Sequence, residues 1–228
     1  MNNKKLSAIS FMVSAILIAA IIFLAYGIYD ADVRTKAADE QSKRYLVNLQ
    51  ELDDLAHKTS LTGLLTLDAF METLEPRFEA GDFGGVSAFV SFDGDNMGKL
   101  NETYGQSATN RLVYEIGLVV KKYFPENENN IVCNVGDRSD EFYMMLTGRS
   151  SKEELLAEVE AMQQGIRDIE VLSDDGRTVK GTVSVGIAFY GEDEGGTDFN
   201  EMFENSDSAA YAAKEAGKDC YRVYGEEE

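Results

Sequence analysis

An uncharged apolar run near the N-terminus constrains the fold of this chain more than any other feature of its sequence. From Leu6 to Tyr29 the sequence LSAISFMVSAILIAAIIFLAYGIY contains no charged residue. As a helix, a run of about 24 residues extends roughly 36 Å, which is enough to cross a bilayer with some tilt. A cleaved signal peptide would have an apolar region of about 7 to 15 residues and a small-x-small cleavage site, and neither is evident. We therefore predict that residues 1–29 form a retained, single-pass transmembrane anchor.

The charges that flank this run bear on its orientation. Lys4 and Lys5 precede it, and four basic residues follow it, namely Arg34, Lys36, Lys43 and Arg44. Because cytoplasmic flanks carry an excess of Lys and Arg, we expect the C-terminal part of the protein in the cytoplasm. The N-terminal amine narrows the difference, so charge alone leaves the orientation open.

Residues 30–58 are polar and are predicted to continue the anchor as a helical stalk. Five apolar residues recur there near helical spacing, namely Val33, Leu46, Leu49, Leu52 and Leu55. Such a face could pair with a second copy of the chain or pack on the domain of its own chain. So few apolar positions leave these two alternatives open.

Composition limits what the rest of the chain, residues 59–228, can be. Its length suits one domain of ordinary size. The formal net charge of −20 argues against a nucleic-acid partner, since binding DNA or RNA needs a basic face. A phosphate ligand would therefore need metal ions or local basic residues. Cys133 and Cys220 lie far apart in sequence, and we expect two reduced thiols with no zinc site or disulfide.

Helical and strand patterns alternate along this domain. Thr66 is a candidate N-cap for a helix through Phe78, and the run VSAFVSFD after it is typical of a buried strand. The runs NIVCNVG and EFYMMLTG predict a β-hairpin. Ser151 with Glu154 matches a capping box before another helix. The alternation predicts an α/β (α+β) domain with a mainly antiparallel sheet flanked by helices.

Two acidic clusters are the candidate chemical centre. Asp93 and Asp95 lie where the strand VSAFVSFD ends, and Asp140 with Glu141 lies in the connection of the hairpin. If that strand lies beside the hairpin, these carboxylates meet at one edge of the sheet, where Mg²⁺ would be bound alongside substrate phosphates. In a chain with 41 acidic residues, such pairs are also typical of a solvated surface, so spacing alone does not decide.

Several segments, in this order, resemble the GGDEF family of diguanylate cyclases. They are SLTGL (Ser60–Leu64), SFDGDNMGKLNETYG (Ser91–Gly105), RSDEF (Arg138–Phe142), and TVSVGIA followed by SDSAAYAAKEAGKD, which ends at Asp219. The resemblance covers nearly everything from Asp54 to Tyr224 and implies a palm domain of the nucleotide-cyclase type. In that family two domains face each other as a homodimer, each holding one GTP. They join the two nucleotides into cyclic di-GMP and release pyrophosphate.

The resemblance implies roles for individual residues. Asp93, the backbone carbonyl of Gly94 and Asp140 would bind Mg²⁺ or Mn²⁺, and Asp140 with Glu141 would be catalytic. The expected nucleotide-binding residues are Lys99, Asn101, Asn110, Lys214 and Lys218. Of these, Lys214 and Lys218 would contact the terminal phosphates, which would compensate locally for an acidic protein.

The sequence also departs from the family pattern. In the signature loop, Arg138, Ser139, Asp140, Glu141 and Phe142, the first two residues replace glycines, which allow a sharp turn and close approach of phosphate. Gly98 replaces a phosphate-contacting lysine, although Lys99 is adjacent. Asn110 replaces an aspartate that accepts hydrogen bonds from guanine, and an amide there could tolerate adenine. The family's product-inhibition motif, Arg-x-x-Asp before the signature, is absent.

Three hypotheses follow from these features. The first is an active cyclase that makes cyclic di-GMP from GTP with Mg²⁺. The second is a degenerate domain that binds nucleotide, or only a protein partner, and signals without catalysis. The third starts from the phrase DGDNMGK, which also resembles palm-type CRISPR polymerases, and predicts a different cyclic oligonucleotide. The closing helix resembles GGDEF proteins more closely, which ranks the third hypothesis last.

Overall fold

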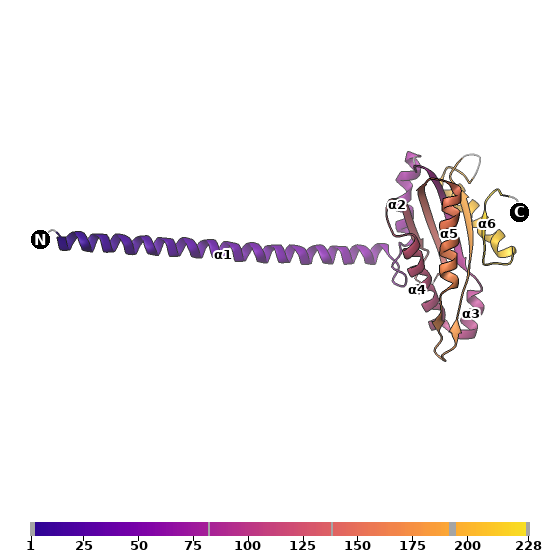
Figure 1. Ribbon diagram of the computed structural model, residues 1–228, viewed down its shortest axis with the longest axis horizontal. Coiled ribbons are helices and arrows are strands. Elements are labelled where there is room, and N and C mark those ends of the chain that lie inside the picture. Colours follow the sequence, from indigo (N-terminus) through magenta and orange to yellow (C-terminus); the bar gives the residue numbers. More distant parts are fainter. Residues whose placement is uncertain (1–2, 82, 138, 192–194, 227–228) are drawn as a thin grey trace. The chain divides into compact units, whose positions relative to one another are not determined.

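The computed structural model describes the backbone of residues 3–81, 83–137, 139–191 and 195–226, and the side chains within these ranges from Ile16 onward. Figure 1 labels the helices. The chain divides into two compact units, Met1–Asp53 and Asp54–Glu228. Arg138 of the signature loop lies outside the described residues, as does the side chain of every residue before Ile16.

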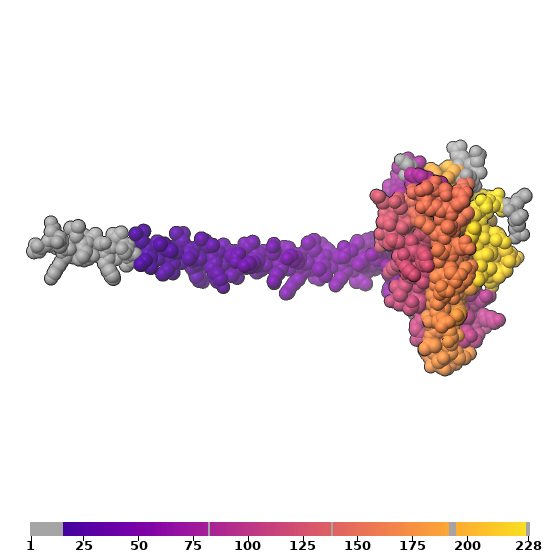
Figure 2. All heavy atoms as spheres, in the orientation of Figure 1, coloured from indigo at the N-terminus to yellow at the C-terminus, as the bar shows by residue number. Residues whose placement is uncertain are grey.

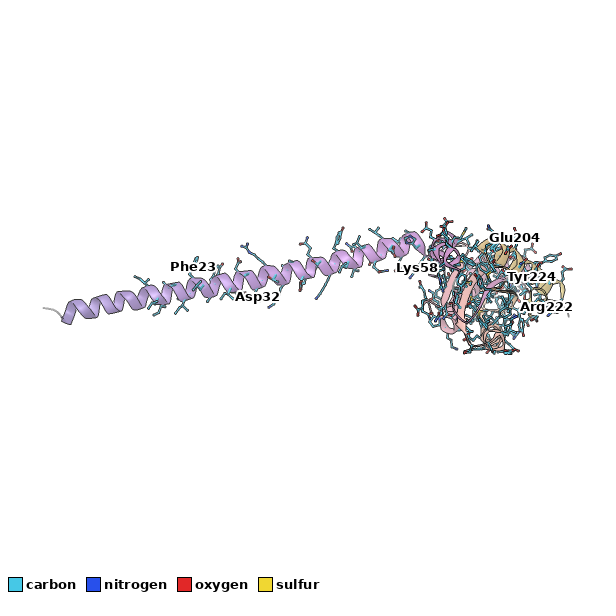
Figure 3. The ribbon with its side chains drawn as sticks, turned by 90° about the horizontal axis from the view of Figure 1, so that it is seen from above. Phe23, Asp32, Lys58, Glu204, Arg222 and Tyr224 are labelled. Carbon is cyan, nitrogen blue, oxygen red and sulfur yellow. The ribbon has the colours of Figure 1, made fainter. Side chains whose placement is uncertain are left out.

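The described residues of the N-terminal unit all belong to one long helix, α1 (Asn3–His57), whose last turn falls in the second unit. The prediction that a helix continues from the apolar run through the polar residues that follow it is therefore confirmed. From Ile16 to Tyr29 the large apolar side chains of α1 are exposed, for example Phe23 at 78% and Ile28 at 72%. Figure 2 draws the helix as spheres, and Figure 3 shows the Phe23 side chain projecting from it. By length and composition, α1 is able to cross a membrane.

The polar part of α1 is stabilised along its own surface. Arg34 pairs with Asp30 at 2.9 Å, and Lys36 pairs with Asp32 at 2.7 Å. Both pairs have the acidic residue four positions before the basic one, the favourable order on a helix, and each contributes about 0.2–0.5 kcal/mol.

The second unit is built on a five-stranded sheet with the order β2-β3-β1-β6-β7. Every neighbouring pair is antiparallel except β6 with β7, which is parallel, so the predicted mainly antiparallel sheet is confirmed. The strands are β1 (Val86–Gly94), β2 (Asn130–Asn134), β3 (Glu141–Arg149), β6 (Val183–Phe189) and β7 (Tyr221–Val223). The predicted hairpin is β2 with β3, and the predicted buried strand is the central β1.

Two apolar clusters fix the sheet between helices. Ala88, Val90 and Phe92 of β1 pack with side chains of α4 (Gln106–Tyr123) and α5 (Lys152–Arg167). Phe89 of the same strand faces the other way and packs with α2 (Leu67–Ala80) and α6 (Phe199–Glu215). Alternate residues of a strand point to opposite faces. The sheet therefore forms the middle layer of this unit, as Figure 1 shows.

The local signals at helix starts are confirmed in part. The Thr66 side chain accepts a hydrogen bond from the Ala69 backbone and caps α2, as predicted. Ser151 likewise caps α5 by accepting from the Glu154 backbone N–H, but the Glu154 carboxylate bonds the backbone of Ser150 rather than that of Ser151. A small hairpin, β4 (Val171–Leu172) with β5 (Thr178–Val179), and a short helix, α3 (Met97–Tyr104), were not predicted.

A single glycine lets α6 lie against the sheet. A Cβ added at Gly186 of β6 would lie 1.9 Å from the carbonyl oxygen of Ser206 and 2.2 Å from the backbone nitrogen of Ala210. Both atoms belong to the α6 backbone, which cannot move aside as a flexible side chain can. Glycine is therefore required here by close approach of two backbones.

We expect Gly186→Ala to destabilise the protein by about 3 kcal/mol or more, because overpacking against backbone is poorly relieved. Chemical denaturation of the full-length protein in detergent measures this. The matched control is Gly98→Ala, where an added Cβ meets nothing within 4 Å. Because alanine is the better helix former by about 1 kcal/mol, the control is expected to be neutral or stabilising. Equal unfolding midpoints for the two variants would contradict this account of Gly186.

Candidate active site

The pairing of β1 with β3 brings the acidic clusters together. Asp93 lies opposite Glu141 in the register of the two strands, and the Gly94 backbone N–H donates to the Asp140 carbonyl at 3.2 Å. We call the edge formed by Asp93, Asp140 and Glu141 the carboxylate edge. The structure thus places the predicted metal-binding and catalytic residues side by side at one end of the sheet.

Burial and mutual repulsion perturb these carboxyl groups. Burial, followed by the negative charge of Asp93, raises the pKa of Asp140 to about 6. The pKa of Glu141 is also raised, first by burial and then by the charges of Asp93 and Asp207. Two like charges held this close favour protonation of one of them. A positive charge placed next to the carboxylate edge would therefore stabilise its ionised carboxylates.

Lys214 of α6 supplies part of that charge. Its ammonium group forms an ion pair and hydrogen bond with the Asp93 carboxylate. Burial acts to lower the pKa of Lys214, but the hydrogen bond and the negative charge of Asp93 outweigh this and raise it. The predicted phosphate-binding lysine therefore contacts a predicted metal ligand directly.

A small polar cavity lies beside the carboxylate edge on the α6 side of the sheet. It has a volume of about 150 Å³, and its lining includes Ser91, Asp93, Glu141, Asp207 and Lys214. The Ser91 hydroxyl is buried and has no hydrogen-bond partner among the described residues. Sequence reasoning missed Asp207, although its spacing of seven from Lys214 places both on one face of a helix.

Asp95, the second residue of the first acidic cluster, has a different environment. It is 3% exposed, and its carboxylate accepts hydrogen bonds from the hydroxyls of Thr182 and Ser184, both at 2.6 Å. It also accepts from the backbone N–H of Asp219 at 3.1 Å. Its hydrogen bonds join the end of β1 to β6 and to the segment after α6, which carries Lys218. The Asp95 carboxylate thus holds neighbouring segments of the fold together and is not part of the carboxylate edge.

A buried side-chain amide holds the backbone of the signature loop. The Asn134 side chain is fully buried and donates to the backbone carbonyls of Ser139 and Glu141, both at 3.0 Å. Ser139 in turn accepts from the Glu141 backbone N–H through its hydroxyl, at 3.1 Å. The carboxylate of Asp137, which precedes the loop, accepts from the backbone N–H of Ser60 and so connects the chain before the loop to the motif SLTGL. Sequence reasoning missed Asn134, because nothing in NIVCNVG marks which polar residue is buried.

The expected base-contacting residues form a second group. Asn101 of α3 donates to Gln106 at 3.1 Å, and Gln106 donates to Asn110 of α4 at 2.9 Å. In the described residues, no hydrogen bond joins this group to the carboxylate edge. Lys99 is exposed on α3, and Lys218 donates to the Asn96 side chain at the end of β1.

The carboxylate edge offers carboxylate oxygens, the type of ligand that hard divalent cations prefer. Asp93 and Asp140 offer carboxylate oxygens, and the pKa of Asp140 is raised first by burial and then by the negative charge of Asp93. In the described part of the chain, no group of three or more His, Cys, Asp or Glu side chains is placed to hold a metal ion by itself. Mg²⁺ commonly uses one or two carboxylates together with water and substrate phosphates, so the residues fit such an ion.

The chain matches a known protein family and several curated relatives. A family profile described as "Diguanylate cyclase, GGDEF domain" matches residues 56–220. The chain is 27% identical over 181 residues to cyclic di-GMP phosphodiesterase PdeR of Escherichia coli K12, covering 77% of this chain and 25% of that protein. It is 23% identical over 170 residues to diguanylate cyclase DgcM of the same strain, covering 74% of this chain and 38% of that protein. The chain thus spans well under half the length of these curated relatives.

Solved structures resemble this fold closely. One of them is the coiled coil and GGDEF domain of DgcB from Caulobacter crescentus in complex with c-di-GMP. The TM-score is 0.68 at 19% sequence identity, and the match covers 85% of this chain and 97% of that chain. At this identity the likeness establishes the fold.

We expect Asp140→Asn to stabilise the protein at pH 7.5 more than at pH 5. The folded-state pKa of Asp140, about 6, lies above its ordinary value. The protonated form therefore stabilises the fold at low pH, and this contribution is lost as the pH rises from about 4 through about 6. Discounted for partial exposure to about 1 kcal/mol, the gain at pH 7.5 corresponds to about 2–4 °C in Tm. Thermal unfolding of the full-length protein with EDTA measures it.

The control for this prediction is Asp175→Asn. The hydrogen bond from Ser173, with Arg177 nearby, lowers the pKa of Asp175, so its carboxylate form is the favoured one. Its amide variant is expected to lose stability, or to show no change, at pH 7.5. A Tm for Asp140→Asn that is unchanged or lower at pH 7.5 would contradict the conclusion that burial and the charge of Asp93 make the Asp140 carboxylate unfavourable.

Proposed function

The chain belongs to the GGDEF family of diguanylate cyclase domains, and we propose that it is a membrane-anchored cyclase that binds GTP at the carboxylate edge and makes cyclic di-GMP. The observation that carries this proposal is the strand register that sets Asp93 opposite Glu141 and bonds Gly94 to Asp140. That register gathers the carboxylates, and α6 adds Lys214 beside them, where a triphosphate and its cation would be bound.

The roles of the residues follow from their chemistry. Asp93, Asp140 and the Gly94 carbonyl would hold Mg²⁺ or Mn²⁺. Such an ion would neutralise phosphate charge and polarise the α-phosphate. Lys214 and Lys218 would bind the terminal phosphates as cations.

The remaining steps concern the base and the proton. Asn101 and Asn110 would contact the purine, with Lys99 near the phosphates. The 3'-hydroxyl of each nucleotide would attack the α-phosphate of the other, with pyrophosphate as the leaving group. Glu141, whose pKa is raised and which lies opposite Asp93, is the candidate acceptor of the hydroxyl proton.

The N-terminal helix would hold this domain at the membrane. Exposure of the apolar side chains between Ile16 and Tyr29 to water would be unfavourable, whereas their contact with the hydrocarbon of a lipid bilayer is favourable. We propose that the GGDEF domain lies on the cytoplasmic side, where GTP is available. Leu46, Leu52 and Leu55 of the stalk are all more than 60% exposed, which supports pairing with a second copy. Such a homodimer would bring two sites face to face.

A second candidate function rests on the signature loop. Ser139 has a Cβ where the family has none, Gly98 has no lysine side chain, and Asn110 offers a donor where an acceptor is usual. Such a domain would bind nucleotide without turnover and signal through a partner. The Asn110 amide could also form hydrogen bonds with adenine. With ATP as the substrate, the product would be a different cyclic oligonucleotide.

We expect the full-length protein, in nanodiscs with Mg²⁺ or Mn²⁺, to convert labelled GTP into cyclic di-GMP. Asp93→Asn and Asp140→Asn are expected to lower the rate at least about a hundredfold, because each removes a charge from the phosphate site. Glu160→Gln, an exposed change on α5, is the control and is expected to keep the rate. A product containing adenine from ATP would favour the third hypothesis. Calorimetric binding of nucleotide without any product would favour the non-catalytic one.

We also expect the double change Arg138→Gly with Ser139→Gly to raise turnover by about tenfold or more, since a phosphate misplaced by about 1 Å costs up to a hundredfold. Steady-state production of cyclic di-GMP measures this. Ser139→Ala is the matched control, because it removes the hydroxyl but keeps the Cβ, and it is expected to give no gain. If the glycine variant binds GTP no better and turns over no faster than the parent, obstruction at the loop is not the limiting departure.

A further inference from the structure

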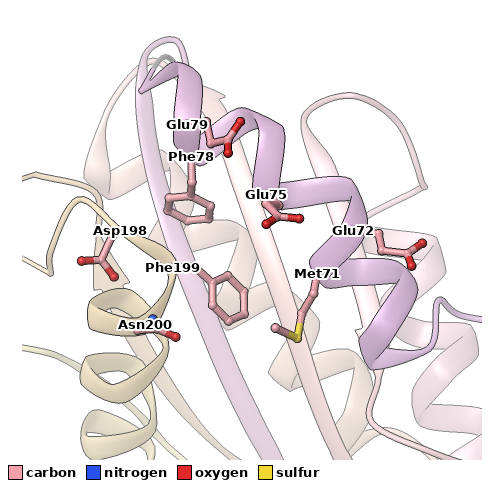
Figure 4. A pocket seen from close by; sticks show the side chains of 8 residues that line it. All are labelled: Met71, Glu72, Glu75, Phe78, Glu79, Asp198, Phe199 and Asn200. Atoms are coloured by element: carbon pink, nitrogen blue, oxygen red, sulfur yellow. The ribbon is translucent and has the colours of Figure 1, made fainter.

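A groove between α2 and the first turn of α6 lies apart from the residues of the carboxylate edge. Its volume is about 590 Å³. Met71, Phe78 and Phe199 form its apolar floor in Figure 4. The two phenyl rings meet edge to face with centroids 5.9 Å apart, and Met71 is 42% exposed. The floor is therefore both apolar and accessible.

Carboxylates line this groove along one side. Glu72, Glu75 and Glu79 follow one another on α2 at spacings of three and four, so they share one face of the helix. Figure 4 shows them along the α2 wall. Within the described part of the chain, none of the three forms an ion pair. Like charges at these spacings repel one another.

The basic residue of α2 does not relieve this repulsion. Arg77 donates to the Glu128 carbonyl at 2.7 Å and to Thr147, and its guanidinium lies over the Phe83 ring. On the opposite wall, the Asp198 side chain caps α6 by accepting from the Glu201 backbone. The groove thus combines an apolar floor with a row of exposed, unneutralised glutamates.

We propose that this groove binds a basic amphipathic helix of a partner protein. Apolar side chains of that helix would pack on Met71, Phe78 and Phe199. Lys or Arg side chains repeated at spacings of three and four would face Glu72, Glu75 and Glu79. A helix fits because the groove is walled by two helices, and an amphipathic helix presents apolar and charged side chains at these same spacings.

Charge complementarity identifies the occupant as a different protein. The chain carries a net charge of −20, so most surfaces of a second copy would be repelled by the glutamates. The basic run at Lys43 and Arg44 of the stalk is the self-derived alternative, and it is tested below. This proposal goes beyond nucleotide chemistry and does not depend on the domain being an active cyclase.

The test uses the full-length protein in nanodiscs of neutral lipid. A displayed library of helical peptides of about 18 residues, randomised at apolar and charged positions, is selected for binding. Counter-selection uses the variant Glu72→Gln/Glu75→Gln/Glu79→Gln. We expect enriched peptides to carry Lys or Arg at helical spacing beside apolar anchors. Fluorescence anisotropy of the best peptide is expected to show binding weakened about tenfold by the triple variant, and by salt of about 0.5 M.

Two further variants make the test specific to the groove. Glu128→Gln/Glu160→Gln/Glu226→Gln changes the net charge equally at exposed sites elsewhere, and it is expected to alter the affinity less than about twofold. Met71→Gln changes an exposed side chain of the floor and is expected to weaken binding without changing its salt dependence.

Three results would overturn the proposal. The first is equal weakening by both triple variants, which would show mere attraction of basic peptides to an acidic protein. The second is enrichment of no peptide, or only of peptides without basic residues. The third is displacement of the selected helix by a synthetic peptide of residues 36–52, which would assign the groove to the stalk of a second copy.

Discussion

The site depends on one strand pairing, in which β1 and β3 hold Asp93 opposite Glu141. Like charges at facing positions of a sheet destabilise it. Burial, followed by the negative charge of Asp93, raises the pKa of both Asp140 and Glu141. The pairing is tolerated because Lys214 lies on Asp93. Lys214 reaches that position only because α6 packs closely on β6, which the missing side chain of Gly186 allows. The electrostatics at the sheet edge therefore rest on a backbone contact in the core.

A second set of buried polar contacts gives the edge its shape. Asp95 is buried with three hydrogen bonds, and it fastens β1 to β6 and to the backbone of Asp219. Next to that point, Lys218 adopts a left-handed backbone with φ of 70° and reaches Asn96. A buried carboxylate with all its hydrogen bonds made is costly to disrupt. One acidic residue of the first cluster thus serves the charge of the site, and the other serves its geometry.

The sequence predicted the elements whose signals are local. The cap at Thr66 follows from the type of residue that begins a helix, and the hairpin of β2 with β3 follows from two apolar runs joined by a short polar turn. Both signals lie within a few neighbouring residues, so the local sequence was enough to predict them. The roles of Asp95 and Asn134 were not predictable from pattern, since burial of a polar residue depends on partners far away in sequence. Helix α3 was missed because it is short and opens at Asn96, in a left-handed conformation without a side-chain cap. The family resemblance supplied the remaining site residues.

In the altered signature loop, the described residues 139–142 are supported by contacts that need no glycine. The buried Asn134 amide donates hydrogen bonds to the carbonyls of Ser139 and Glu141. The Asp137 carboxylate accepts a hydrogen bond from the backbone N–H of Ser60. Neither contact needs a glycine, so the loop can keep Asp140 and Glu141 at the edge while its outer surface changes. What glycine provides in this family is close approach of phosphate to the backbone. For catalysis, the departure that matters most in the described part of the loop is therefore the bulk that Ser139 adds next to Asp140 and Glu141.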